Sequence, residues 1–579
     1  MLFRSIPLAN VFLPDHYLKH SGEERNRILL VANAMLSLVL LQGMFLIQNL
    51  TSIDTTYAAA NSTFSSAIPA IAGSSVTTYK GNKYRTGNYS AETILNTSNV
   101  NAAQFGKRVT YPVNGQVYAQ PLFVPHLLVN GAIHNVVFVA TEHDSVYAFD
   151  ADSTTAISPL WSTSFLTSGA TPVLASDVSC DDVSPEIGIT STPVIVTSSN
   201  TLYVVAFTKE NGSLIYRLHA IDITTGHEKP GSPIVIQGNS GGIAFDPSHE
   251  RQRGALLAVN GQVYVSFGAF CDLPPDYGWI ISYRYSSSNA LFQQTAIYND
   301  TVIGGGGGIW GAGGGLASDG SGNIYTVTSN GTFNLNTGGP SAGDTVLKLT
   351  PQLNVIDYFT PFNQLCLAQG DIDLGSGGPL LLPGINEQIV AGKEGRIYVV
   401  NNLNMGKFTP DPTLDCSSTE QNRTDIDHVL QEFPPQTIGN YFDGNNFSTP
   451  ADWNSRVYFG GVNDYIKAYR LNDRLLSPTP ISQTPETFGF PGGNPVISSN
   501  GVRSGTGVLW VIDPHAVLCA YDATNLANEL YNSNINASRD ALDSYVKFTV
   551  PTVGNGKVFV GTQTSLAIYG LFATRQSGV

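Results

Sequence analysis

Charged side chains are scarce in this chain, since Asp, Glu, Lys and Arg make up only 13% of its 579 residues. Long solvated helices need many such side chains, so the composition argues against a largely helical protein. Other residue types are plentiful: the chain has 58 Gly, 32 Pro, 26 Tyr and 27 Phe. Aromatic residues favour strands and Gly and Pro favour turns, so we expect many short strands joined by turns.

Basic residues are in deficit. The 29 Lys and Arg face 44 Asp and Glu, which gives a net charge of −15. A protein that binds nucleic acid needs a face rich in Lys and Arg for the phosphates. The charge balance therefore excludes nucleic acid as an expected partner and fits an acidic, solvated surface.

Cysteine is sparse as well, and the five cysteines never form a C-x-x-C motif. This excludes a thiolate zinc cluster and a C-x-x-C-H haem attachment. An odd number leaves at least one thiol unpaired in an exported protein. The sequence does not fix which of the five residues pair: Cys180, Cys271, Cys366, Cys416 and Cys519.

One long stretch without charge lies near the N-terminus, over residues 28–53. It is long enough to cross a bilayer as a helix, and Arg25 and Arg27 precede it, so the rest of the chain is expected outside the cytoplasm. The following "TYAAANS" also suits a cleavage site, which would make the stretch a signal segment. We therefore predict an N-terminal transmembrane or signal helix and an extracytoplasmic main domain, membrane-bound if the helix is uncleaved.

From about residue 100 a repeat runs through the chain. Each unit has an apolar strand, a turn, a β-rich strand, a second turn and a strand of the Y-A-x-D type, as in "QPLFVPHLLVNGAIHNVVFVATEHDSVYAFDA". Eight units follow one another, roughly 45–70 residues apart, which is the pattern of a propeller. They are too long for a β-helix and too regular for unrelated sandwiches.

The last unit lacks its fourth strand, and the spare segment "FGKRVTYPV" (105–113) precedes the first. We predict that this segment completes the last blade and closes the ring, because closure removes exposed sheet edges. The predicted organisation is an all-β, eight-bladed propeller with these parts: a cytoplasmic tail (1–27), an anchor or signal segment (28–53), a linker (54–99), the propeller (100–573) and a tail (574–579).

The blades resemble the pyrroloquinoline-quinone (PQQ) alcohol dehydrogenase-like superfamily of eight-bladed propellers. The resemblance is carried by "VYAFDADSTTAISPLW" and "LHAIDITTGHE", which are similar to the family's Ala-x-Asp-x-x-Thr-Gly-x-x-x-Trp docking repeat, with Trp161 ending the first. In catalytic members, PQQ is stacked on a tryptophan in the central funnel beside calcium held by Glu and Asn. An Asp acts as base, and a Lys or Arg contacts the quinone. The resemblance therefore implies PQQ and calcium as cofactors.

The most specific match is the glycine-rich "GGGGGIWGAGGGLASDGSGNIYTVTSNG". By resemblance, Trp310 and Gly311 are the expected cofactor-stacking pair and Asn330 a calcium ligand. Glycine permits backbone to approach a flat ligand, so the run is expected to lie at the propeller axis. The alternative is a packing tryptophan and a hairpin asparagine.

Three further segments supply the other expected site residues. Glu210 in "AFTKENGSLIYRLHAID" matches the family's calcium glutamate, and its alternative is an exposed hairpin charge beside Lys209. Asp373 in "GDIDLGSGG" is the expected base and a metal ligand, with Asp371 its catalytic neighbour; the alternative is a capping Asx turn. Lys393 in "AGKEGRIYVVNN" matches the lysine that contacts the quinone, unless it is a surface lysine paired with Glu394.

One segment departs from the family. Where enzymes of the family often have two adjacent cysteines followed by Asp and then Arg, "SCDDVSPEIG" keeps Cys180 and Asp181, and Ser179 replaces the first cysteine. The usual arginine is missing too. The acids here suit either a solvated loop or a second cation site: Asp177, Asp181, Asp182 and Glu186.

Two functions remain open at this point. The first is an exported, PQQ- and calcium-dependent dehydrogenase that oxidises an alcohol or sugar and passes electrons to a separate acceptor. The second is a non-catalytic propeller scaffold that binds protein or glycan. Fold does not decide between them, because function depends on the site.

Overall fold

The computed structural model describes residues 75–440 and 444–572. The predicted cytoplasmic tail, anchor or signal segment and C-terminal tail lie outside these residues, as does the predicted linker up to residue 74. No helix in the described ranges is long and apolar enough to cross a membrane.

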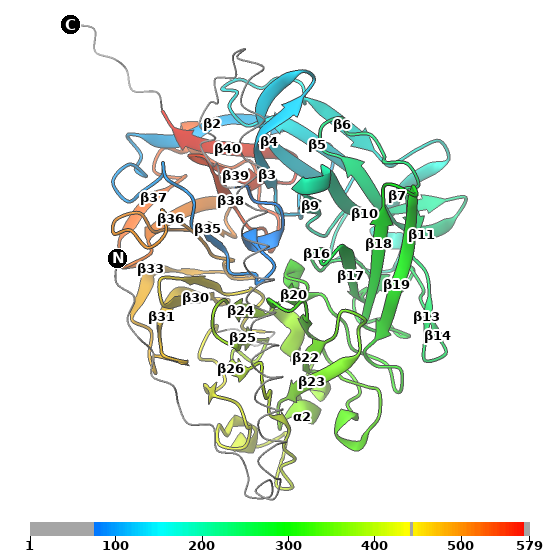
Figure 1. Cartoon of the computed structure of the whole chain (residues 1–579). Helices are drawn as coiled ribbons and strands as arrows, with labels where there is room; N and C mark the ends of the chain where they lie inside the picture. Colours follow the sequence, from blue (N-terminus) through cyan, green and yellow to red (C-terminus); the bar gives the residue numbers. More distant parts are fainter. Residues whose placement is uncertain (1–74, 441–443, 573–579) are drawn as a thin grey trace, which may run out of the picture. The chain divides into compact units, whose positions relative to one another are not determined.

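Eight antiparallel sheets follow one another along the chain and form the blades of a propeller (Figure 1), as the repeats predicted. Blade 1 consists of β3 (Leu122–Val129), β4 (Ala132–Thr141), β5 (Ser145–Asp150) and β6 (Trp161–Ser164). Blade 2 consists of β9 (Val194–Val196), β10 (Thr201–Glu210), β11 (Ser213–Asp222) and β12 (Ile234–Val235). Blade 3 consists of β16 (Leu257–Val259), β17 (Gln262–Ala269), β18 (Trp279–Ser286) and β19 (Leu291–Asn299). Blade 4 consists of β20 (Ala317–Ser318), β21 (Ile324–Val327), β22 (Val346–Leu349) and β23 (Val355–Thr360).

The second half of the ring repeats this plan. Blade 5 consists of β24 (Leu380–Leu382), β25 (Glu387–Ala391), β26 (Ile397–Asn401) and β28 (Gln431–Glu432). Blade 6 consists of β29 (Ala451–Trp453), β30 (Arg456–Gly460), β31 (Asp464–Asn472) and β33 (Ser482–Phe488). Blade 7 consists of β34 (Val496–Ser498), β35 (Val508–Asp513), β36 (Val517–Asp522) and β37 (Glu529–Asn532). Blade 8 consists of β38 (Thr552–Gly554), β39 (Lys557–Gly561), β40 (Ser565–Leu571) and β2 (Phe105–Pro112).

Shorter elements decorate the blades. The added strands are β1 (Asn88–Tyr89), β7 (Ala170–Leu174), β8 (Glu186–Ile187), β13 (Asn239–Ser240), β14 (Ile243–Ala244), β15 (Glu250–Arg251), β27 (Lys407–Phe408) and β32 (Leu475–Leu476). The short helices are η2 (Tyr79–Gly81), η3 (Ala175–Asp177), η4 (Thr197–Ser199), η5 (Gly311–Gly313), η6 (Leu335–Thr337), α2 (Gln364–Gln369), η7 (Leu374–Ser376), η8 (Thr419–Asn422) and α3 (Ala537–Asp540).

The predicted closing strand is confirmed. β2 pairs antiparallel with β40, so that Phe105 faces Leu571 and Pro112 faces Ser565. A segment from the beginning of the propeller thus supplies the outer strand of the last blade. The ring closes through backbone hydrogen bonds between residues more than 450 positions apart, which leaves no free edge at the seam of the two chain ends.

The core lies between neighbouring blades. In one apolar cluster, for example, Phe207 and Leu218 of blade 2 pack with Val265 and Ile281 of blade 3. The docking repeat adds a polar link, because Trp161 of blade 1 donates its Nε1–H to the Ile223 carbonyl beyond β11, at 2.9 Å. Gly226 lies against the indole, where a Cβ would come within 2.6 Å of the ring.

Residues 76–89, called here the axial segment, lie within the predicted linker (54–99). They contact the first strand of one blade after another, so they run through the middle of the ring, where Figure 1 shows a blue segment. The backbone contacts, taken in chain order, join Val76 to Phe123, Thr77 to Ile195, Lys83 to Ser318, Tyr84 to Leu381, Thr86 to Asp452 and Gly87 to Ile497.

Two buried basic side chains belong to the axial segment, and burial lowers the pKa of both. Lys80 is fully buried and donates to the carbonyls of Thr449, Pro450 and Pro495. Arg85 is equally buried and donates its Nε–H to the Leu316 carbonyl at 2.8 Å, with its other nitrogens bonded to Thr78, Tyr79 and Leu256. The axial segment therefore ties the inner strands together beneath the site described next.

Candidate active site

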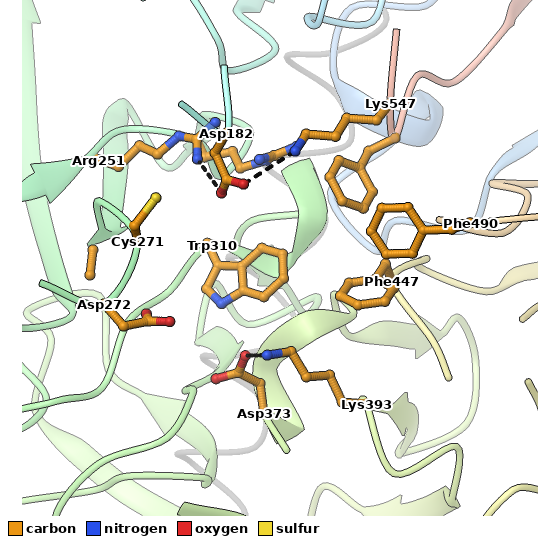
Figure 2. A pocket seen from close by; sticks show the side chains of 13 residues that line it. Asp182, Arg251, Cys271, Asp272, Trp310, Asp373, Lys393, Phe447, Phe490 and Lys547 are labelled. Atoms are coloured by element: carbon orange, nitrogen blue, oxygen red, sulfur yellow. Dashed lines mark hydrogen bonds and ion pairs between the residues drawn. The ribbon is translucent and has the colours of Figure 1, made fainter. Parts of the chain in front are cut away.

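A cavity of about 280 Å³ opens where the connections between blades meet. Trp310, from the connection between blades 3 and 4, lies in the middle of it (Figure 2). Each successive connection adds at least one side chain to the wall, from blades 1–2 round to blades 7–8: Asp182, Arg251, Trp310, Asp373, Phe447, Phe490 and Lys547. Because these seven connections converge here, the cavity lies at the axis of the propeller.

Trp310 forms the floor of the cavity. It directly precedes η5, its side chain is half-buried, and its ring centroid lies 6.2 Å from that of Phe447. Gly311 is buried behind it, against the backbone of Gly378. The structure thus presents the predicted indole to the cavity, while Gly311 lies behind it and packs against the protein.

The glycine run was expected to approach a flat ligand, but in the structure it surrounds a buried carboxylate. Gly304–Gly308 all have positive φ, and they curl around the buried carboxylate of Asp300, which accepts the Gly308 N–H at 3.2 Å. A Cβ on Gly307 would lie 2.5 Å from Asp300 Oδ1, so only glycine fits there. Gly306 also bridges to Gly331, beside Asn330. The run therefore shapes the backbone under Asn330.

The structure brings four of the predicted side chains together on one side of Trp310. Lys393 Nζ lies 2.7 Å from Asp373 Oδ2 and 3.1 Å from Asp371 Oδ1. Asn330 donates its backbone N–H to Asp373 Oδ1 at 3.0 Å and its Nδ2–H to Asp371 Oδ1 at 2.8 Å. We call these four residues, with Asp272, the acidic end of the cavity.

Charges in the acidic end are strongly coupled. Burial by itself lowers the pKa of Lys393, but Asp373 and then Asp371 outweigh it and hold that pKa above its ordinary value. Lys393 is therefore a permanent ammonium ion shared by two carboxylates. Asn330 Oδ1 is buried, and no residue of the described ranges donates to it.

Glu210 does not join this group. It ends β10 in the hairpin of blade 2, where Arg217 Nη2 donates to its Oε2 at 2.9 Å and Thr208 donates to its Oε1 at 2.8 Å. The hydrogen bond from Arg217 lowers the pKa of Glu210. The carboxylate is thus held in its own blade, and the predicted calcium set of Glu210, Asn330 and Asp373 is not assembled.

The residues present do not fit calcium as predicted. Calcium requires six to eight oxygen ligands around one point. Within the described ranges, one group of three His, Cys or acidic ligand atoms lies close enough together to share an ion: Cys180, Asp182 and Cys271. Its two sulfurs form a disulfide with each other, so they are not thiolate ligands. At Asp371 and Asp373 the positive charge is supplied by Lys393.

Asp272 also lines the cavity, although it was not predicted from the sequence. It follows Cys271 in the connection between β17 and β18, and both residues have positive φ. Asp272 is exposed as a whole residue, but partial desolvation of its carboxylate in the cavity wall, with the charges of Asp373 and Asp371, raises its pKa to about 6, and Lys393 opposes the shift. The hairpin of blade 3, rather than the hairpin of blade 2 that holds Glu210, delivers a carboxylate to the site.

A basic wall lies on the other side of Trp310 and was also missed (Figure 2). We define it as Arg251, Arg253 and Lys547. Asp182 accepts from Arg251 Nη1 at 3.0 Å and from Lys547 Nζ at 3.3 Å. Burial raises the pKa of Asp182, but the three cations outweigh it and lower the pKa to about 2. The sequence signal was "ERQRG" (250–254), which places two arginines together in a chain poor in charge.

Disulfides connect these parts. Cys180 pairs with Cys271, which joins the connection that holds Asp182 to the hairpin that holds Asp272. Cys366 pairs with Cys416, and Cys519 is free and buried. Among the other acids near Cys180, Asp177 bonds Lys209 at 2.6 Å and Glu186 bonds His143 at 2.9 Å, so both carboxylates have side-chain partners.

The fold is an eight-bladed propeller, and solved structures of quinoprotein alcohol dehydrogenases share it. Quinohemoprotein alcohol dehydrogenase from Comamonas testosteroni has a similar structure over 87% of this chain and 82% of its own, with a TM-score of 0.55 and 13% identity. Quinohemoprotein alcohol dehydrogenase from Pseudomonas putida HK5 is similar over 87% of this chain and 82% of its own, with a TM-score of 0.56 and 12% identity.

A europium-containing methanol dehydrogenase is similar over 86% of this chain and 98% of its own, with a TM-score of 0.55 and 13% identity. No family model and no curated protein sequence matches the chain. At such identities the likeness establishes the fold alone, and the predicted eight-bladed propeller is confirmed.

Proposed function

We propose that this protein is a PQQ-dependent dehydrogenase that oxidises an alcohol or a sugar. The observation that carries the proposal is the placement of an ion pair, Asp373 with Lys393, beside the indole of Trp310 in one cavity. The likeness to quinohemoprotein alcohol dehydrogenases and to a methanol dehydrogenase supports the same reading.

The residues of the cavity fit a flat, anionic cofactor. Trp310 offers an aromatic face on which a planar ring can stack. PQQ carries carboxylates, and the wall supplies the cations Arg251, Arg253, Lys393 and Lys547. Two nitrogens of Arg251 are buried and have no acceptor in the described part of the chain, which is the state expected of groups that meet a ligand.

Asp373 would act as the proton acceptor. Oxidation of an alcohol removes a hydride and a proton, and the bound quinone would supply the acceptor for the hydride. The proton would go to Asp373, whose carboxylate is oriented by the Asn330 N–H and by Lys393. Lys393 would stabilise negative charge on the quinone oxygens. The proposed steps use no metal ion, because Glu210 lies away from Asn330 and Asp373 and the predicted calcium ligands are not assembled.

We propose further that the domain works outside the cytoplasm. Its two disulfides support this location, since such bonds persist in oxidising compartments. The electrons would then leave to a separate acceptor, and the charge-free residues 28–53 would attach the chain to the membrane if they are retained.

Turnover by the full chain tests the proposed function. The chain is incubated with PQQ and assayed for dye-linked oxidation of a panel of primary alcohols and aldoses, beside Asp373→Asn and the matched control Asp371→Asn. We expect activity in the wild type and a loss of about 10²–10⁴-fold in Asp373→Asn, because a general base is removed. The exposed Asp371 should matter much less. An inactive wild type that still binds protein or glycan ligands would favour the scaffold function.

A further inference from the structure

We propose that the basic wall is an anion-binding subsite whose built-in counterion, Asp182, is replaced by a carboxylate of the ligand. The ligand class is a planar aromatic carboxylate that stacks on Trp310. This inference deepens the proposed function and rests on it for the identity of the ligand as PQQ.

Arg251 provides the first observation. Its side chain is only 5% exposed, and its Nη1–H donates to Asp182 at 3.0 Å. Its Nε and Nη2 are buried and have no hydrogen-bond partner in residues 75–440 and 444–572. Unpaired buried donors on a charged group are costly, so a site that keeps them gains stability when an acceptor arrives. A carboxylate offers two oxygens to the flat guanidinium.

Arg253 provides the second observation. It is 4% exposed, and its guanidinium lies 4.4 Å from the ring centre of Phe548 and 5.9 Å from that of Tyr118. Its guanidinium makes no hydrogen bond to the part of the chain that the structure describes, although it lines the cavity. Burial and then the charge of Arg251 lower the pKa of Arg253 to about 10, so it remains charged at neutral pH.

The charges around the wall leave an excess of positive charge. Asp182 is ionised, since its pKa is about 2. The other nearby acid is the buried Glu142, which accepts from Gly188 N at 2.8 Å and from Thr190 at 2.9 Å, and burial raises its pKa to about 7. Three cations thus face one full negative charge and one partial one. An additional anion is favoured here.

Asp182 is placed so that a ligand can replace it. Its side chain is 49% exposed, whereas that of its partner Arg251 is almost completely buried. Release of Asp182 therefore moves a carboxylate into water, where it is well solvated, and leaves the buried cation for the ligand. Figure 2 shows the wall on one side of the indole and Asp373 with Lys393 on the other. A flat ligand anchored at the wall would thus present its opposite edge to the acidic end.

Equilibrium calorimetry with two quinones tests the subsite. PQQ carries carboxylates, and 1,10-phenanthroline-5,6-dione is a flat ortho-quinone without them. The full chain is compared with Arg251→Gln, Asp182→Asn and the control Arg284→Gln, which changes an exposed arginine on β18. We expect Arg251→Gln to weaken PQQ binding about tenfold or more, because a charge-assisted hydrogen bond is lost. Binding of the dione should change less than twofold.

Asp182→Asn should act in the opposite direction and tighten PQQ binding several-fold, because the competing carboxylate is gone. Damage to the fold cannot produce tighter binding, so this variant separates the subsite from a general loss of structure. The proposal is overturned if the wild type does not bind PQQ, if both variants bind it as the wild type does, or if both quinones respond equally.

The same experiment separates the subsite from the proposed function, since calorimetry reads binding without turnover. A protein that binds PQQ with the expected pattern but oxidises no alcohol or sugar would contradict the proposed function and leave the subsite intact. An active protein that is indifferent to Arg251→Gln and Asp182→Asn would overturn the subsite alone.

Discussion

The axial segment and the cavity both place basic side chains in the middle of the ring. They differ in whether the nitrogen donors of these side chains have hydrogen-bond acceptors. Lys80 and Arg85 of the axial segment are fully buried, and backbone carbonyls and one hydroxyl accept from all their donor nitrogens. In the cavity, Arg251 keeps two buried nitrogens unpaired and the Arg253 guanidinium has no hydrogen bond within the described ranges.

This difference separates structural charges from functional ones. A buried cation whose donors are all satisfied has no capacity left for a ligand, so Lys80 and Arg85 are expected to hold the inner strands together. A buried cation with unpaired donors lowers stability until a ligand supplies the acceptors. Changes in the axial segment should therefore alter stability, and changes in the cavity should alter binding and turnover.

The largest expected effect on stability follows from removing Arg85. Arg85→Ala leaves the carbonyls of Leu316 and Leu256 without their buried donor and empties the space of a guanidinium. We expect the free energy of unfolding to fall by about 3 kcal/mol or more, as measured by urea denaturation.

Arg284→Ala is the matched control, because Arg284 is exposed on β18. A change within about 0.5 kcal/mol is expected there. An equal fall in the free energy of unfolding for both substitutions would contradict the account, because it would mean that the axial segment does not hold the inner strands together.

A smaller and pH-dependent effect is expected in the cavity. The folded protein raises the pKa of Asp272 from 3.8 to about 6. A group of this kind contributes stability below its unfolded pKa and loses that contribution as the pH rises through the folded pKa. The ionised Asp272 should therefore weaken the fold above about pH 6.

Asp272→Asn should accordingly raise the urea midpoint at about pH 8 and leave it nearly unchanged at about pH 4. The stabilised variant should also lose part of its turnover, because the acidic end has lost a carboxylate. A lower midpoint at high pH would show that Asp272 supports the fold and is not held there for a ligand.

Much of the fold could be predicted from the sequence because it is periodic. Each repeat carries its own strands and turns, and the leftover "FGKRVTYPV" was the one segment that matched the missing strand of the last blade. Trp310, Asn330, Asp371, Asp373 and Lys393 were predicted from segments that resemble the family's motifs. The structure brings the last four into contact with one another and places Trp310 in the same cavity as Asp373 and Lys393.

The remaining features are not periodic, and local patterns do not reveal them. Glu210 was predicted because it matches the family's calcium glutamate, whereas Asp272, which matches no family motif, is the carboxylate in the cavity wall. Arg251 and Lys547 meet through Asp182 across 296 positions, 251 to 547, which no local motif records. Residues 75–99 resemble a linker because their long-range backbone partners lie on the inner strands of six different blades, which no local pattern reveals.

Tryptophan fluorescence during a PQQ titration tests the central claim most directly. The claim is that a flat anionic quinone lies on Trp310, between the basic wall and the acidic end. The wild type is compared with Trp310→Phe, which retains an aromatic face but removes the reporting indole. We expect saturable quenching in the wild type that is largely absent from Trp310→Phe, while calorimetry shows that the variant still binds PQQ. Equal quenching in both proteins would place the quinone elsewhere and contradict the account.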